Sequence, residues 1–138
     1  MMTNKWPESL PAVQCRIARP TNRLDKLKRF YRDGLGLEII GEFENHAGYS
    51  GVMFGLPGHD YHLEFTSHVD GSSCPAPTKD NLLVFYIPNR EAIRGLTERL
   101  NSLGYPEVPP ENPYWEKQGV TFEDPDGWRV VLMNSRGI

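Results

Sequence analysis

The chain repeats one pattern of secondary structure, and this repetition constrains its fold more than any other feature. Each half contains an apolar strand, an amphipathic helix and then short strands. The first half starts with a strand over 13–18 and the second with the apolar run 81–87. An internal duplication of a unit that cannot bury its own apolar face indicates that the copies pack together. The sequence therefore predicts two modules in one chain of 138 residues.

In the first half, a helix is predicted to follow Pro20. Thr21 and Asn22 have short polar side chains that can cap its first free amides. Gly34 and Gly36 end it, because glycine tolerates the left-handed conformation at a helix terminus. The apolar positions form one stripe with helical spacing, at Leu24, Leu27, Tyr31 and Leu35. We expect strands to follow at about 37–43, 49–56 and 60–67.

A segment rich in Gly, Ser and Pro, residues 69–79, is predicted to link the halves. The second helix has an apolar stripe at Ile93, Leu96, Leu100 and Leu103. Several prolines exclude regular structure across most of 106–114. The segments 120–123 and 129–133 are predicted to form a hairpin, joined by a type I turn at Asp124-Pro125-Asp126-Gly127.

One sheet with one helix covers only one sheet face, so the two copies must complete each other. The sequence predicts an α+β fold in which two βαβββ modules form one curved mixed sheet, with helices outside and a concave cavity. We expect a single domain over 1–138, with module one at about 12–68, the linker at 69–79 and module two at about 80–134. The residues expected to form the core under the helices are Ile17, Leu63, Phe65, Leu83, Phe85, Ile87, Val130 and Leu132.

Several short motifs, taken in order, point to a known group of proteins. They are Phe30-Tyr31-Arg32-Asp33 with Leu35-Gly36-Leu37, Leu63-Glu64-Phe65, and Asp124-Pro125-Asp126-Gly127 before an apolar strand. Over residues 13–134 the chain resembles the vicinal oxygen chelate superfamily, which includes glyoxalase I, extradiol dioxygenases, and bleomycin- and fosfomycin-resistance proteins. The stretch from Asn112 to Arg129 also resembles an uncharacterised glyoxalase-like subgroup.

The resemblance implies a metal ion bound by four strand residues, which map here to Arg16, Glu64, Leu82 and Val131. Only Glu64 matches the usual ligand type, although Gln14 is a second possibility in the first strand. Leu and Val donate no lone pair, and Arg is a permanent cation that repels a metal ion. We therefore predict no metal or other cofactor, and an ion pair between Arg16 and Glu64. The alternative is an Arg16 side chain that extends to solvent.

His62 and Glu64 are two residues apart on a predicted strand, so they point to the same face. This pair keeps a metal-dependent alternative open, with one divalent ion at His62 and Glu64 and further ligands from His46 or His68. The pair is also a candidate general acid and base, because a neighbouring carboxylate promotes protonation of a histidine.

The predicted cavity is apolar at one end and polar at the other. The polar end contains Arg16, His62 and Glu64, and Trp115 lies in a proline-stiffened loop that could form a lid or a dimer contact. The apolar residues predicted to line it are Leu82, Val84, Tyr86, Val131 and Met133. Such a cavity suits an aromatic or amphipathic organic molecule.

Composition excludes several function classes. The net charge is −3 without a basic run, so no nucleic-acid partner is expected, and no apolar stretch is long enough to cross a membrane. Two cysteines form no disulfide framework, which favours a cytoplasmic protein.

Three functions fit these observations. The first is metal-independent binding or sequestration of a small organic molecule, in a homodimer as the resemblance implies, without the usual metalloenzyme activity. The second is a lyase, isomerase or dioxygenase with an atypical metal site. The third is an interaction protein with a vestigial pocket.

Overall fold

The computed structural model describes residues 6–55 and 60–138 and confirms the α+β class. The elements of the first half are β1 (Cys15–Pro20), α1 (Leu24–Lys28), the π-helical η1 (Arg29–Gly34), β2 (Glu38–His46), β3 (Tyr49–Gly55) and β4 (Tyr61–His68). Those of the second half are β5 (Leu82–Tyr86), α2 (Arg90–Ser102), the short 3-10 helix η2 (Pro113–Trp115), β6 (Gly119–Glu123) and β7 (Arg129–Met133). Across these described ranges, no helix has the length and apolar character that crossing a bilayer requires.

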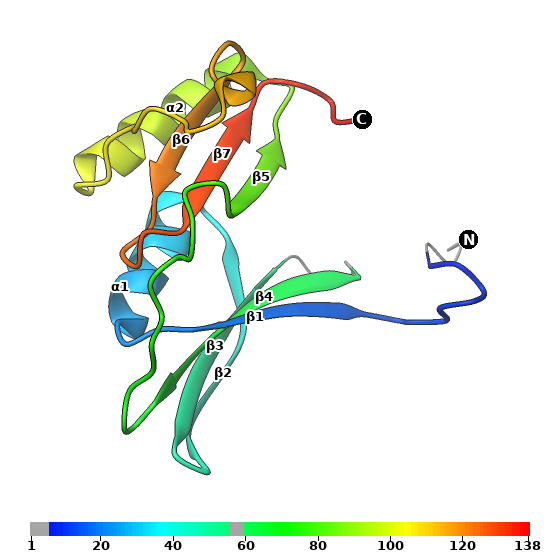
Figure 1. The fold of residues 1–138 in the computed structure, drawn as a ribbon, viewed down its shortest axis with the longest axis vertical. Coiled ribbons are helices and arrows are strands. Elements are labelled where there is room, and N and C mark those ends of the chain that lie inside the picture. The colour runs from blue at the N-terminus through cyan, green and yellow to red at the C-terminus, as the bar shows by residue number, and fades with distance from the viewer. Residues whose placement is uncertain (1–5, 56–59) are drawn as a thin grey trace.

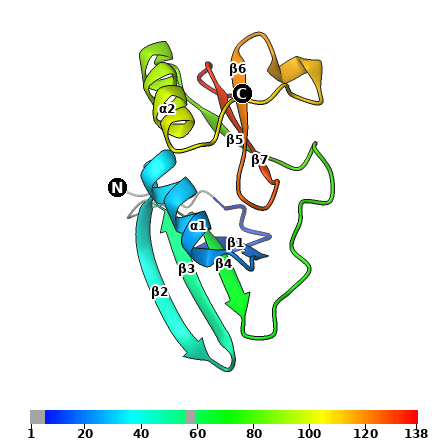
Figure 2. The same cartoon turned by 90° about the vertical axis from the view of Figure 1, so that its left-hand side faces the viewer.

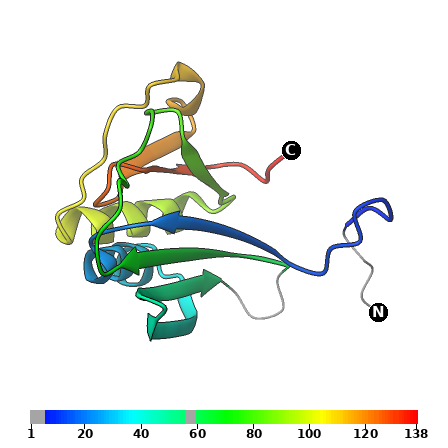
Figure 3. The same cartoon turned by 60° about the horizontal axis from the view of Figure 1, so that its bottom comes forward.

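The strands form two sheets, with the orders β1-β4-β3-β2 and β5-β7-β6 (Figure 1). In each sheet the first strand of the module pairs in parallel with the last one, β5 with β7 and β1 with β4. The blue β1 and the green β4 run side by side in the same direction in Figure 3. Within the described residues of one chain, the expected single curved sheet is thus divided into two. The first strand of each module, β1 or β5, is an edge strand of its own sheet.

The second module has fewer strands than the first. The βαβββ pattern predicted for it is reduced to βαββ, and only an isolated bridge between Val108 and Thr121 marks the position of the remaining strand. Pro109 and Pro110 follow that bridge directly. Because proline has no amide hydrogen for a sheet ladder, this segment cannot extend into a strand.

The first helix departs from regular geometry in its second half. The hydroxyl of Thr21 accepts a hydrogen bond from the amide of Arg23 at 3.0 Å, close to the predicted start. The helix then widens to π-helical turns, where the amide of Leu35 donates to the carbonyl of Phe30 at 3.0 Å. This places both Phe30 and Tyr31 in the core. Residue 56, the last of the strand predicted over 49–56, lies outside the described residues.

The two modules are joined by close packing of their helices (Figure 2). Gly34 lies so near Leu100 of α2 that a β-carbon at Gly34 would be 2.6 Å from Leu100 Cδ2. In addition, Arg99 Nε donates to the carbonyl of Gly34 at 2.8 Å.

The core lies between the helices and the sheets, as expected for most of the predicted residues. Phe65, Val130 and Leu132 are fully or almost fully buried, and Leu63, Leu83, Phe85 and Ile87 pack against them. The prediction for Ile17 was wrong, because its side chain is 54% exposed. Ile17 lies on the edge strand β1, whereas α1 packs against β3 and β4.

Candidate functional site

Three predicted site residues meet on one face of the first sheet. Arg16 of β1 lies beside His62 of β4 in the parallel register. Arg16 Nε donates to His62 Nε2 at 2.9 Å, and Arg16 Nη1 donates to Glu64 Oε2 at 3.3 Å. The predicted ion pair between Arg16 and Glu64 is therefore confirmed, and the guanidinium also binds His62.

Burial differs strongly among these groups. The side chain of Arg16 is 48% exposed and that of Glu64 only 11% exposed, while His62 is buried. Since His62 Nε2 accepts a hydrogen bond, the proton of the neutral ring lies on Nδ1, a buried atom with no hydrogen-bond partner among the described residues. Arg16 thus provides the positive charge for a nearly buried carboxylate and fixes the tautomer of the neighbouring imidazole.

Sequence reasoning missed Met53, whose sulfur lies 3.4 Å from Arg16 Nη2. Met53 pairs with Glu64 across the antiparallel β3–β4 ladder, which brings its side chain to the same face. Because the position of Met53 depends on the register between β3 and β4, strand alternation alone gives no signal for it.

The histidines expected to complete a metal site have other surroundings. The ring of His68 packs against Tyr49, and its Nδ1 accepts a hydrogen bond from the amide of Asp70 at 3.1 Å. His46 is exposed at the end of β2. In the part of the chain that the structure describes, no group of three His, Cys, Asp or Glu side chains could hold a metal ion.

The apolar site residues share one face of the second sheet. Val84 pairs with Val131, and Tyr86 with Met133, in the β5–β7 register; Leu82 lies two residues before Val84 and therefore on the same face. Val131 and Met133 are buried, whereas Tyr86 is 44% exposed. These residues and the Arg16 cluster lie on different sheets, so the described chain does not join them in one hydrogen-bonded sheet.

The loop that carries Trp115 crosses the apolar face at Gly119. A β-carbon at Gly119 would lie 2.5 Å from the carbonyl oxygen of Trp115 and 3.2 Å from Met133 Sδ. Only glycine permits this close approach of the loop. Trp115 itself is half-buried and packs edge-on against the exposed ring of Tyr114, with ring centroids 4.9 Å apart.

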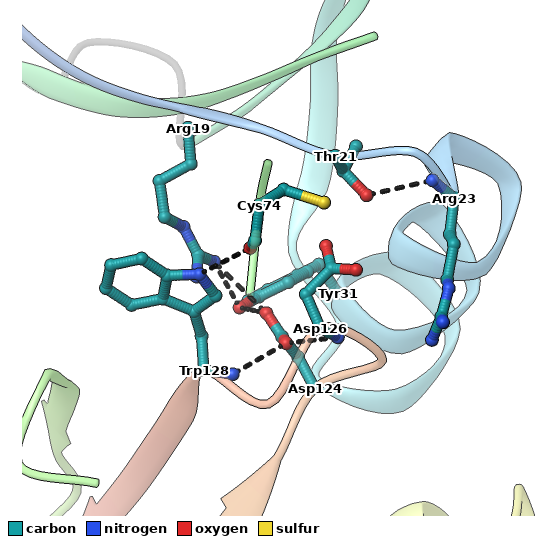
Figure 4. A network of polar contacts seen from close by, with 8 residues as sticks. All are labelled: Arg19, Thr21, Arg23, Tyr31, Cys74, Asp124, Asp126 and Trp128. Carbon is teal, nitrogen blue, oxygen red and sulfur yellow. Dashed lines mark hydrogen bonds and ion pairs between the residues drawn. The ribbon is translucent and has the colours of Figure 1, made fainter. Parts of the chain in front are cut away.

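A second polar cluster joins the two modules (Figure 4). Asp124 Oδ2 accepts hydrogen bonds from Tyr31 at 2.7 Å and from Arg19 Nη2 at 3.1 Å. Its Oδ1 accepts from the amides of Asp126 at 2.9 Å and Trp128 at 3.0 Å. The predicted turn thus does more than reverse the chain, because its first residue binds β1 and η1 of the other module.

The charges in this cluster are held in a buried environment. The guanidinium of Arg19 lies between the rings of Phe65 and Trp128, at 4.8 and 4.3 Å from their centroids. Burial raises the pKa of Asp124, while hydrogen bonding from Tyr31 and the charge of Arg19 oppose that rise. Burial, followed by the nearby charge of Asp124, holds the pKa of Tyr31 well above its ordinary value. Both pKa shifts follow from the shielding of this cluster from solvent. We call the contacts of Asp124 with Arg19 and Tyr31 the joint between the modules.

Comparison with known proteins identifies the family. The profile of the YycE-like N-terminal domain matches residues 15–66, and that of the YycE-like C-terminal domain matches 80–134. The YycE protein of Bacillus subtilis (strain 168) is 59% identical over 130 residues, which cover 94% of each chain. The chain belongs to the YycE-like family.

Solved structures agree with this assignment. A crystal structure of a YycE protein of unknown function from Bacillus subtilis is 58% identical, with a TM-score of 0.92 over 97% of this chain and 98% of that one. Two distant structures share the fold. Glyoxalase I from Leishmania major is 18% identical, with a TM-score of 0.69 over 88% of this chain and 85% of that one. The fosfomycin resistance protein FosX from Mesorhizobium loti is 17% identical, with a TM-score of 0.67 over 87% of this chain and 89% of that one. The predicted resemblance to the vicinal oxygen chelate superfamily is confirmed.

Proposed function

We propose that this protein binds, and thereby sequesters, a small aromatic or amphipathic organic molecule without a metal ion. The observation that carries this proposal is the position of the Arg16 guanidinium, which binds both His62 and Glu64. Glyoxalase and fosfomycin-resistance proteins share the fold, but a shared fold does not transfer a reaction.

The residues at the metal positions implied by the superfamily do not fit a metal ion. Arg16 is a cation at the first position, and Leu82 and Val131 supply no lone pair at two others. Glu64 alone is a suitable donor, and its carboxylate is already paired with Arg16. A metal-dependent lyase or dioxygenase built on His62 and Glu64 would first require Arg16 to leave, so we derive no catalytic step through a metal.

The Arg16 side chain, which is 48% exposed, provides the polar end of the proposed site. The five N–H donors of an arginine exceed the three contacts that Arg16 makes with His62, Glu64 and Met53. The remaining donors suit an oxygen-bearing group of a ligand. The apolar end would come from Leu82, Val84, Tyr86, Val131 and Met133, with Trp115 in the covering loop.

We propose a homodimer in which the two ends of the site come together. The edge strands β1 and β5 both border an apolar groove of about 360 Å³, whose lining includes Ile17 and Leu83. A bare strand edge beside exposed apolar side chains favours pairing with another chain, and the module repeat makes a second copy the natural partner. We also propose a cytoplasmic location, which suits the two free cysteines.

Light scattering tests the dimer. We expect a dimer for the wild type and a monomer for Ile17→Lys, which places a charge in the groove. A monomeric wild type at micromolar concentration would overturn this part of the proposal.

A thermal-shift screen of aromatic and amphipathic compounds tests the function. Binding raises the melting temperature by mass action, and we expect a ligand whose stabilising effect is weaker in Arg16→Gln. Arg94→Gln is the matched control, because Arg94 forms an ion pair of the same 3.3 Å length at an exposed site. No stabilising compound in a broad library would instead favour an interaction protein.

A further inference from the structure

Three atoms of the kinds that bind transition metals surround one guanidinium. His62 Nε2, Glu64 Oε2 and Met53 Sδ lie 2.9, 3.3 and 3.4 Å from nitrogens of Arg16. They come from the neighbouring strands β3 and β4, and all approach Arg16 of β1. An imidazole nitrogen, a carboxylate oxygen and a thioether sulfur thus share a single cation.

The environment makes that cation necessary. The side chain of Glu64 is 11% exposed, and an unpaired carboxylate at such a position is costly. His62 presents a lone pair at Nε2 because it accepts from Arg16. Without the guanidinium, a negative oxygen and a free imidazole nitrogen would lie together with no positive charge between them.

Imidazole and thioether donors select among metal ions. Imidazole suits zinc, copper and nickel, thioether sulfur favours copper, and hard ions such as Mg²⁺ prefer sites made of oxygen alone. Met53 differs in type from the ligands that the superfamily would supply, and His62 differs in position, whereas Glu64 is at a mapped position. The set of three donors is therefore not the one that the superfamily mapping gives.

We infer that Arg16 is a resident cation that keeps metal ions out of this site. His62, Glu64 and Met53 form a latent site for an ion such as Zn²⁺ or Cu²⁺, which becomes available when the guanidinium is removed. This inference rests on the proposed metal-independent function and explains how that independence is maintained.

Equilibrium dialysis against Zn²⁺ or Cu²⁺ alone, followed by metal analysis, tests the inference. We expect no bound ion in the wild type or in Arg16→Lys, which keeps the positive charge. Arg16→Ala should bind about one ion per chain, at least ~10-fold more tightly than the wild type, and Arg16→Ala/Glu64→Gln should lose it. Arg16→Met retains the aliphatic stem without the charge, and it replaces Arg16→Ala if that variant does not fold.

The outcomes separate this inference from the proposed function. Metal-free folded Arg16→Ala and Arg16→Met proteins would overturn the inference and leave the proposed function intact. A wild type that binds stoichiometric metal, lost in Glu64→Gln, would overturn both. If the ligand screen finds no binder while Arg16→Ala takes up metal, only the proposed function is overturned. Arg94→Ala, which removes an exposed arginine of an equally long ion pair, should take up no metal.

Discussion

The joint between the modules provides a direct test of what stabilises this fold. Asp124→Ala removes the acceptors for hydrogen bonds from Tyr31, from Arg19 and from two backbone amides of the turn. The side chain of Asp124 is fully buried and that of Arg19 is 17% exposed, and Tyr31 is fully buried. The substitution therefore leaves a shielded cation and a buried hydroxyl without their partner.

The expected loss of stability follows from this burial. Removal of one partner of a buried ion pair costs about 3–5 kcal/mol, because the remaining charge loses its compensation. For a chain of 138 residues, that loss corresponds to a decrease in melting temperature of about 10–20 °C.

Urea unfolding followed by tryptophan fluorescence measures the change, and differential scanning calorimetry gives the melting temperature. Asp33→Ala is the control, because Asp33 pairs with Arg32 at 2.8 Å while both side chains are about half exposed; it should leave the midpoint unchanged. Equal unfolding midpoints for Asp124→Ala and Asp33→Ala would refute the role assigned to the joint.

Two further predictions concern the same packing. Burial raises the pKa of Asp124 in the folded protein above its ordinary value of 3.8. Protonation of Asp124 therefore favours the folded state. This contribution to stability is fully present below pH 3.8 and is lost as the pH rises through the folded-state pKa. The stability deficit of Asp124→Asn against the wild type should thus be larger at about pH 4 than at about pH 7; a deficit that shrinks in acid contradicts the raised pKa. Gly34→Ala should destabilise by about 1–3 kcal/mol, because its β-carbon would meet buried Leu100. Gly95 lies on α2, the helix of Leu100, with open space around it. Gly95→Ala should therefore stabilise the protein by about 0.5–1 kcal/mol. Equal free energies of unfolding for Gly34→Ala and Gly95→Ala would contradict the close contact between Gly34 and Leu100.

The repeated pattern was sufficient to predict the class of fold and the positions of most strands, because hydrophobic alternation and turn residues act locally. It was not sufficient for the irregular parts. The π-helical turns of η1 accompany the packing of Tyr31 against Phe65 of β4 and of Phe30 against Tyr105, which are distant in sequence. Ile17 has the apolar character of a core residue, but its exposure follows from the position of β1 at a sheet edge.

The candidate site was also predictable only in part, because some of its contacts depend on residues that are distant in sequence. Strand alternation placed His62 and Glu64 on one face, and the mapping to the superfamily placed Arg16 beside them. Met53 was missed, because its place depends on the register between β3 and β4. The contacts of Asp124 with Arg19 and Tyr31 span more than 90 residues of sequence, and no local pattern reveals them.

Isothermal titration of a ligand from the screen, with and without a strong chelator, tests metal-independent binding most directly. We predict the same affinity and stoichiometry in both titrations, because the cation of the site is the Arg16 side chain and a chelator cannot remove it. Loss of binding in the chelator, with recovery on addition of Zn²⁺ or Mn²⁺, would contradict the account.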